Sequence, residues 1–403
     1  DGVENGLFPD IVGVAVDKNG FIYCLEASYG KVFIYDKNGR NLTVFGGGMR
    51  KGWQNGTFEN PSAIALNGDD IIITDRLKNT VTVFSSTEYG LLVKQMQALT
   101  VNGNYSEAEK GWESVLREDA NSQLAYIGLS RAAYDKGDYE EALRLAKSGF
   151  DRETYNLAFT EVRNQFISDH FPLIFSGVII ILIAAAALMI VTNKKKLVFI
   201  KNSSVRSALS CVAHPFSEFA DIKEHNTGSV KLSIVFIALY GVTAVLKTLY
   251  GGFLFTDYNR DSFNSLLTVI RSVGVVVLWI ICSWAISSLM SGIGTFKEVT
   301  VVTGYSLLPL IIWNILYIGL SHIMVESEAG FFKLAEVIFI IIFLLMITAG
   351  STVIHDYGFF KFLGFAVLSI FAIAVVILLF VLIGLLFSQL VSFVMTVAVE
   401  LIT

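Results

Sequence analysis

Long runs without charge dominate the second half of this sequence. Phe171–Thr192 contains no charged residue, and a helix of about 20 residues crosses the ~30 Å hydrocarbon core of a bilayer. Five more such runs lie near 232–250, 266–290, 305–324, 334–354 and 362–390. They are apolar on every side, and a spanning segment must satisfy its own backbone hydrogen bonds. We therefore predict a bundle of six transmembrane helices.

Composition supports a membrane protein with a soluble front half. The chain is 54% hydrophobic, with a mean hydropathy of +0.61. Acidic residues outnumber basic ones up to about residue 171, which argues against a nucleic-acid partner. The three cysteines, Cys24, Cys211 and Cys282, lie far apart and lack metal-binding spacing. We expect no disulfide framework, no metal and no cofactor.

Residues 1–90 show a repeated pattern of short strands. Three runs rich in β-branched and aromatic residues recur about 50 residues later; they are Ile11–Val16, Phe21–Leu25, Val32–Tyr35, then Ser62–Leu66, Ile71–Thr74 and Val81–Phe84. Asn-Gly turns follow the first copies, and the Gly-rich stretch Gly46–Gly56 separates the two sets. Several strands per repeat of this length predict β-propeller blades.

The second copy, from Ile72 to Phe84, resembles the NHL-type repeat of propeller proteins. The first copy departs from that repeat at Glu26, where the repeat prefers Asp. Two blades cannot close a ring of about four to eight. The chain begins at Asp1 without an export signal, and we expect further blades ahead of it.

Residues 91–170 switch to helical periodicity with a second repeat. Gly103, Tyr105 and Ala108 recur 34 residues later; the second set is Gly137, Tyr139 and Ala142. This spacing and these small and aromatic positions resemble a short tetratricopeptide array. Such arrays present a groove to a partner, although a plain spacer between propeller and membrane is the alternative.

Basic residues predict the orientation in the membrane. Lys194–Lys196, Lys201, Arg206 and Lys223 lie between the first and second apolar runs, and Lys and Arg mark cytoplasmic loops. Residues 1–170 should therefore be extracytoplasmic and residues 193–230 cytoplasmic. Only Arg260, beside two aspartates, lies in the next loop.

Two groups of residues resemble the Yip1 family of multi-spanning proteins. Pro215 and Phe219 lie before the second apolar run. The second group combines a small-residue turn with a Gly-Tyr…Pro span start; its residues are Gly292, Gly294, Phe296, Gly304, Tyr305 and Pro309. The resemblance implies a five-helix domain over residues 231–403, with 171–192 as an added tether.

Physical roles can be predicted for some of these positions. Gly292 and Gly294 allow a tight turn or close helix approach. Phe216, Phe219 and Phe296 suit the inner membrane interface, as in amphipathic segments, and plain structural packing in the bundle is the alternative.

Three charges near the ends of the spans are candidate functional residues. Lys247, Arg271 and Glu336 lie within one or two turns of the predicted outer ends. Buried intramembrane charges are costly and often functional, so they are predicted to form a paired cluster. The alternative is that each side chain snorkels separately to the headgroups.

Catalytic motifs are absent from the sequence, so we expect no enzyme. The main hypothesis is a multi-pass accessory or scaffold protein of a bacterial cell membrane. Its outer modules would bind a ligand, or a protein of the membrane or envelope such as a transporter. The alternative is a transporter or channel in its own right.

Overall fold

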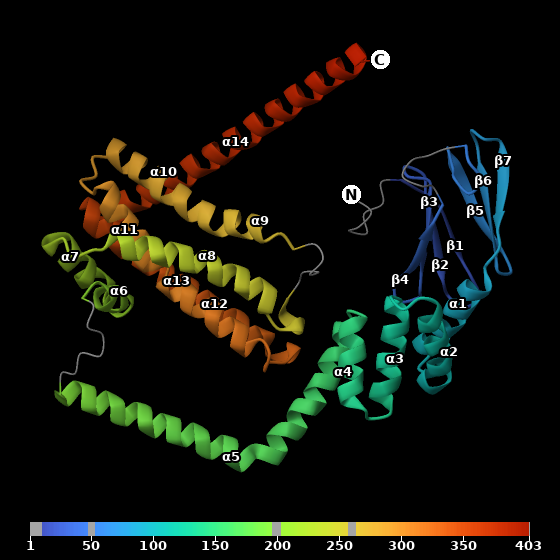
Figure 1. Cartoon of the computed structure of the whole chain (residues 1–403), viewed down its shortest axis with the longest axis horizontal. Helices are drawn as coiled ribbons and strands as arrows, with labels where there is room; N and C mark the ends of the chain where they lie inside the picture. Colours follow the sequence, from blue (N-terminus) through green and yellow to red (C-terminus); the bar gives the residue numbers. More distant parts are fainter. Residues whose placement is uncertain (1–9, 47–52, 196–202, 257–262, 403) are drawn as a thin grey trace. The chain divides into compact units, whose positions relative to one another are not determined.

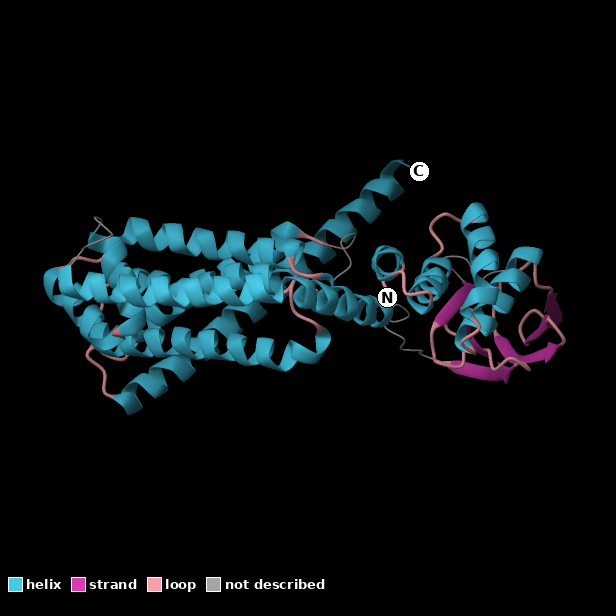
Figure 2. Cartoon of the chain, turned by 90° about the horizontal axis from the view of Figure 1, so that it is seen from below, coloured by secondary structure: helices cyan, strands magenta, loops and turns pink. Residues whose placement is uncertain are grey.

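A computed structural model describes residues 10–46, 53–195, 203–256 and 263–402 (Figure 1). Within helices, side chains are not described for 178, 181–182, 184–195 and 394–402. The chain divides into two compact units, Asp1–Asp169 and His170–Thr403, which are described separately. Among the described residues, strands occur only in the amino-terminal unit (Figure 2).

Two antiparallel sheets open the amino-terminal unit. The first has the order β1-β2-β3-β4 and the second β5-β6-β7. The strands are β1 (Ile11–Val16), β2 (Ile22–Glu26), β3 (Lys31–Tyr35), β4 (Asn41–Phe45), β5 (Pro61–Asn67), β6 (Asp70–Asp75) and β7 (Thr80–Phe84). The predicted runs correspond to six of these strands, and β4 was missed. A propeller is not formed by the part of the chain described.

An aspartate turn connects β1 to β2 in the first sheet. The carboxylate of Asp17 accepts hydrogen bonds from the backbone N–H groups of Asn19 and Phe21 at 2.8 and 3.0 Å. Gly20 closes this turn with a φ of +84°, a conformation that costs glycine little. The Asn-Gly signal therefore marks a real reversal, and its geometry depends on the preceding aspartate.

Four antiparallel helices follow the sheets. They are α1 (Glu88–Val101), α2 (Tyr105–Glu118), α3 (Gln123–Asp135) and α4 (Tyr139–Ser148). The long α5 (Arg152–Lys195) then continues into the second unit. One apolar cluster, with Trp112 fully buried, joins α1, α2 and α3. The next, around Ala142 and Ala158, joins α3, α4 and α5.

The second unit is a helical bundle. Its elements are α6 (Ser203–Ala213), α7 (Pro215–His225), α8 (Val230–Tyr250), η1 (Phe253–Phe255), α9 (Ser265–Val269), η3 (Ile270–Gly274), α10 (Val275–Leu289), α11 (Phe296–Ser306), α12 (Leu308–Leu320), η4 (Glu326–Glu328), α13 (Ala329–His355) and α14 (Phe359–Ile402). Among the described residues, 5 helical segments are long and apolar enough to span a membrane. They are Val230–Tyr250, Ser265–Leu289, Phe296–Leu320, Glu326–His355 and Phe359–Phe393.

The central span is α11 with α12, Phe296–Leu320, most of which is buried inside the bundle. It begins earlier than the predicted 305–324 because Thr295 and Glu298 form a capping box before it. Gly304 and Tyr305 consequently lie inside the span, and the predicted location at its start is wrong. Small and β-branched residues before Gly304 let α8 and α13 pack closely on both sides.

The segment between the first two predicted spans is also more ordered than a loop. Helices α6 and α7 occupy it, and Ala208, Cys211, Phe219 and Ile222 join the core of the bundle. The side chains of Lys194–Lys196 and Lys201 lie outside the described residues. The predicted tether 171–192 has a helical backbone within α5, and its role as a sixth span stays a prediction.

Candidate functional site

The amino-terminal unit contains a groove of about 970 Å³ between the first sheet and the helices. Strand β4 forms one wall, with Asn41, Leu42, Thr43 and Phe45. Helices α1 and α3 and the turn before α5 form the opposite wall. This volume lies in the range of clefts that bind small molecules or peptide segments.

Strand β4 gives the groove an unpaired backbone edge. It is the last strand of its sheet, so one side of its backbone has no strand neighbour among the described residues. Edge strands of this kind can pair with an extended peptide, while neighbouring pockets select its side chains. The opposite wall supplies apolar Val93 and Leu124 together with the polar groups of Asn121 and Gln123. The groove therefore combines backbone pairing with mixed side-chain recognition.

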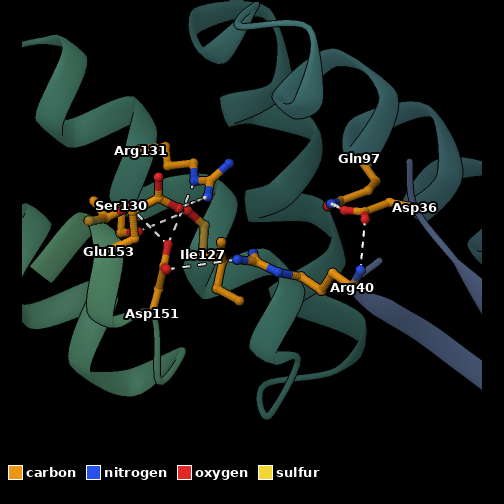
Figure 3. Close-up of polar contacts among 9 residues, drawn as sticks. Asp36, Arg40, Gln97, Ile127, Ser130, Arg131, Asp151 and Glu153 are labelled. Carbon is orange, nitrogen blue, oxygen red and sulfur yellow. Dashed lines mark hydrogen bonds and ion pairs between the residues drawn. The ribbon is translucent and has the colours of Figure 1, made fainter. Parts of the chain in front are cut away.

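A polar network fixes the sheet against the helices beside this groove (Figure 3). Asp36, after β3, accepts hydrogen bonds from the backbone N–H groups of Asn38 and Arg40. Its second oxygen accepts from Nε2 of Gln97 on α1 at 2.9 Å. Asp36 and Gln97 are buried, so this bond replaces lost hydration and fixes the angle between sheet and helix.

Asp151 is the second centre of the network. Its buried carboxylate lies 3.8 Å from Nη2 of Arg40 and 3.6 Å from Nε of Arg131 (Figure 3). Arg131 also contacts the exposed Glu153 at 3.2 Å. Arg40 and Arg131 therefore share the carboxylate of Asp151, and Glu153 adds a second carboxylate beside Arg131. This group of side chains adjoins a second hollow of about 460 Å³ that Arg40, Arg131, Asp36 and Glu153 help to line.

The repeat residues of the helical region set the geometry of the helix hairpins. Gly103 and Gly137 have φ values of +83° and +81° at the turns before α2 and α4. Tyr105 and Tyr139 each begin the following helix. Ala108 and Ala142 are fully buried where the helices pack; both line the interior rather than the groove.

The second unit contains an ion pair between two of the three predicted charged residues. Nζ of Lys247 on α8 lies 2.7 Å from Oε1 of Glu336 on α13. The same ammonium lies 4.3 Å from the centre of the Tyr317 ring. Arg271, exposed on η3, forms no ion pair with any described residue; Arg260 and its aspartates lie outside the described residues. The structure thus brings together Lys247 and Glu336, and places Arg271 apart.

Polar and aromatic residues adjoin this pair. Nδ2 of Asn314 donates to Oγ1 of Thr243 at 3.2 Å, linking α12 to α8 inside the bundle. Trp313 stacks on Phe339 and contacts Phe332. The ion pair itself stays partly exposed, with 25% of the Lys247 side chain and 38% of the Glu336 side chain accessible.

The predicted glycine turn is held by a histidine from a distant helix. The backbone N–H of Gly294 donates to Nδ1 of buried His355 at 3.2 Å. A Cβ atom would lie 2.6 Å from that nitrogen at Gly294 and 2.9 Å from it at Gly292. The turn therefore requires glycine at both positions because the imidazole approaches the backbone closely.

The other motif residues are packing positions in the bundle. Pro215 begins α7, and Pro309 lies in the first turn of α12, where a missing N–H costs little. A Cβ at Gly304 would lie 2.5 Å from the Ser233 side chain. The hydroxyl of buried Tyr305 accepts a hydrogen bond from the backbone of Ser229 at 3.1 Å.

The expected interfacial position of Phe219 is wrong. Phe219 is fully buried in the core of the bundle, because α7 packs along α13 and leaves no room for a surface position. Phe216 and Phe296 are exposed. Phe296 also makes an edge contact with the Trp284 ring.

These elements correspond to a known family. Residues 209–386 match the Yip1 domain. The Yip1 domain extends from α6 into α14 and overlaps all five candidate spans; it also includes the glycine, proline and aromatic motif residues from Pro215 to Pro309. No curated protein matches the chain.

The Yip1 domain also contains one group of potential metal ligands among the described residues. Asp221, Glu224 and His225 lie on one face of α7, with ligand atoms within 4.8 Å of one another. All three side chains are exposed, as is usual for a solvated helix face. Burial raises the pKa of the Cys211 thiol on α6 to about 12, which keeps this thiol protonated.

Proposed function

We propose that this protein is an integral membrane scaffold whose amino-terminal unit binds a partner in the β4 groove. The observation that carries the proposal is the groove of about 970 Å³, with an edge strand on one side and helices α1 and α3 on the other. An extended segment of a membrane or envelope protein fits this combination of backbone edge and mixed side chains.

The repeat patterns support an interaction module. The paired helices with glycine turns at Gly103 and Gly137 are consistent with a tetratricopeptide-like array. The two sheets are consistent with NHL-like blades, since each contains the same antiparallel strand sequence. Tetratricopeptide arrays present extended concave surfaces to partners.

The proposed orientation places the amino-terminal unit outside the cytoplasm. The cluster Lys194–Lys196, together with Arg206 and Lys223, would lie on the cytoplasmic side. The segment 171–192 then acts as a tether that crosses the membrane once. We propose a bacterial cell membrane as the location.

The Yip1 domain would organise a membrane complex, and a transport complex is one candidate. Its central span is packed on most sides by the other helices, which suits a stable anchor better than an open pathway. The Lys247–Glu336 ion pair is the feature that would favour the alternative, a transporter or channel.

Site-specific photo-crosslinking in native membranes tests the groove. A photoreactive residue at exposed Thr43 on β4, or at exposed Gln123 on α3, should give adducts with the same partner. A matched probe at Glu113, exposed on α2 outside the groove, should give none of that adduct. Equal labelling from all three positions, or no adduct from either groove position, would contradict the proposal.

A further inference from the structure

The ion pair of Lys247 and Glu336 lies at one end of the helical bundle. Lys247 is in the last turn of α8, and Tyr317 is in the last turn of α12. Glu336 lies within two turns of the start of α13. The polar headgroups of a bilayer add about 5–8 Å to each side of its hydrocarbon core. The ends of spanning helices therefore bring these charges within reach of lipid headgroups.

The ion pair leaves bonding capacity unused on both partners. Nζ of Lys247 lies 2.7 Å from Oε1 of Glu336 and 4.3 Å from the centre of the Tyr317 ring. An ammonium group has three N–H donors, and the carboxylate and the ring engage at most two of them. Oε2 of Glu336 accepts no hydrogen bond from a described residue. Both side chains are partly exposed, so one donor and one acceptor remain available side by side.

The platform beneath the pair is fixed by its own contacts. The hydroxyl of Tyr317 donates to the backbone oxygen of Phe255 at 2.7 Å. The Tyr317 ring packs on Phe332 of α13, with 4.7 Å between ring centres. One turn further into the bundle, Asn314 donates to Thr243 and ties α12 to α8. These contacts hold Lys247 and Glu336 in place before any ligand binds, which lowers the entropic cost of binding.

The surface around the pair is apolar. Val337 and Ile340, next to Glu336 along α13, are exposed, as is Leu246 beside Lys247 on α8. These side chains belong to two of the candidate membrane spans. Lipid acyl chains are therefore expected to cover them. A lipid molecule at this surface would carry its headgroup beside the free donor and acceptor.

We propose that Lys247 and Glu336 bind the headgroup of a zwitterionic phospholipid with a primary ammonium, such as phosphatidylethanolamine. The lipid phosphate accepts a hydrogen bond from the free N–H of Lys247, and the lipid ammonium donates to Oε2 of Glu336. Hydrogen bonds between ionised groups are about twice as strong as neutral ones. The proposal does not depend on partner binding in the β4 groove.

The same geometry discriminates against other common headgroups. A choline headgroup has no N–H and cannot donate to Oε2 of Glu336. An anionic headgroup without an amine would bring its phosphate near the Glu336 carboxylate and leave that carboxylate without a new partner. The primary ammonium is thus the part of the ligand that the carboxylate selects.

Native mass spectrometry of the full chain tests the headgroup preference. The purified protein is equilibrated in detergent with equal amounts of phosphatidylethanolamine, phosphatidylcholine and phosphatidylglycerol that share the same acyl chains. The ethanolamine lipid should be retained about two- to fivefold more than either of the others, which is the range that partly exposed ion pairs give. Equal retention of the ethanolamine and choline lipids, or a preference for the glycerol lipid, overturns the proposal.

Two variants assign the preference to the ion pair. Glu336→Gln should shift the preference to the glycerol lipid, because Lys247 would keep a phosphate site without a carboxylate beside it. Arg271→Gln is the matched control: it removes an exposed charge that forms no ion pair with a described residue, and the preference should stay unchanged. Retention of the original preference in Glu336→Gln, or its loss in Arg271→Gln, contradicts the assignment. The ratio for the unmodified chain decides the proposal even where Glu336→Gln does not fold.

Free phosphoethanolamine distinguishes a lipid from a soluble ligand with the same headgroup. Added at the concentration of the lipid, it should leave the retained lipid in place, because it lacks the acyl chains that cover the apolar surface. Displacement of the lipid by the headgroup alone would show that the site takes a soluble aminoalkyl phosphate, and would overturn the lipid as the occupant.

Discussion

His355 and the glycine turn at Gly292–Gly294 form a contact between residues far apart in the sequence. The Nδ1 atom of His355 must be unprotonated to accept the hydrogen bond from Gly294. The imidazole also stacks on Tyr357. A side chain with this many neighbours leaves no volume for a methyl group on the turn.

Gly294→Ala should therefore destabilise the bundle, by about 2 kcal/mol or more, because its Cβ would overlap the imidazole. Gly319→Ala is the matched control, since a Cβ there meets nothing within 4 Å. We expect the control to be neutral or to stabilise α12 by about 0.5–1 kcal/mol. Thermal unfolding in detergent measures both. Equal melting temperatures for the two variants would show that the close approach is unimportant.

Lys247 and Glu336 should behave as a coupled pair. Glu336→Gln leaves the ammonium without its partner beside apolar helices, so stability should fall. Adding Lys247→Met should restore part of that loss, with a coupling energy of about 1 kcal/mol or more. The thermal shift of both single variants and the double variant measures this coupling.

Arg271→Gln provides the control for that double-mutant cycle. Arg271 forms no ion pair with a described residue, so its effect should add to that of Glu336→Gln within about 0.5 kcal/mol. If the effects of Lys247→Met and Glu336→Gln also add, the result would favour independent snorkelling of all three charges.

At the scale of single elements, the buried end of β6 connects sequence pattern to stability. Asp75 accepts hydrogen bonds from the backbone N–H groups of Glu59, Asn60, Leu77 and Lys78. Burial alone would raise its pKa, but these four donors outweigh burial and lower it. Glu26 holds the equivalent turn in the first sheet through Ser28 and Tyr29.

Because the pKa of Asp75 is lowered, its contribution to the stability of the second sheet depends on pH in a definite direction. An unfolded aspartate ionises near pH 4, so the contribution is fully present above that pH. It is lost as the pH falls through the lower folded-state pKa. Asp75→Asn should remove this dependence and destabilise the second sheet by about 1–3 kcal/mol at neutral pH.

Hydrogen exchange across 59–78, compared between Asp75→Asn and the unmodified chain at each pH, measures this effect. The two proteins should differ clearly at pH 7 and converge in strongly acidic buffer. A difference that is constant with pH would exclude the carboxylate as its cause. Asp69→Asn, a solvent-exposed change in the preceding turn, serves as the control.

Strand and helix positions were largely predictable because periodicity and turn residues are local signals. Six of the seven strands follow the apolar runs, and helices replace strands from Glu88, close to residue 91 where the helical periodicity was predicted to begin. Helices α6 and α7 were missed because their basic residues indicated a loop. The spacing of Phe216, Phe219 and Ile222 was the available signal for an amphipathic helix.

The tertiary parts of the site were not predictable from one sequence. The contacts between Gln97 and Asp36, and between Gly294 and His355, join residues 61 positions apart in each case. No local pattern specifies such partners. Arg271 shows the opposite case. Its depth along the spans, similar to that of Lys247 and Glu336, predicted one cluster of three charges. Arg271 nevertheless forms no ion pair with a described residue.

At the scale of the whole molecule, the proposed function assigns recognition to the amino-terminal unit and membrane anchoring to the second unit. The described cavities lie in the amino-terminal unit, whereas the Yip1 domain is a packed bundle with five candidate spans. The proposed scaffold role requires that the membrane separate the groove from helices α6 and α7. A spacer function, by contrast, would require no accessible groove at all.

Cysteine accessibility in intact cells tests that arrangement most directly. The native cysteines are buried, and exposed Asn121 and Glu224 represent the amino-terminal unit and α7. A membrane-impermeant thiol reagent should label Asn121→Cys from outside intact cells and should label Glu224→Cys only after lysis. Labelling of Glu224→Cys in intact cells, with Asn121→Cys protected until lysis, would reverse the topology and contradict the proposed function.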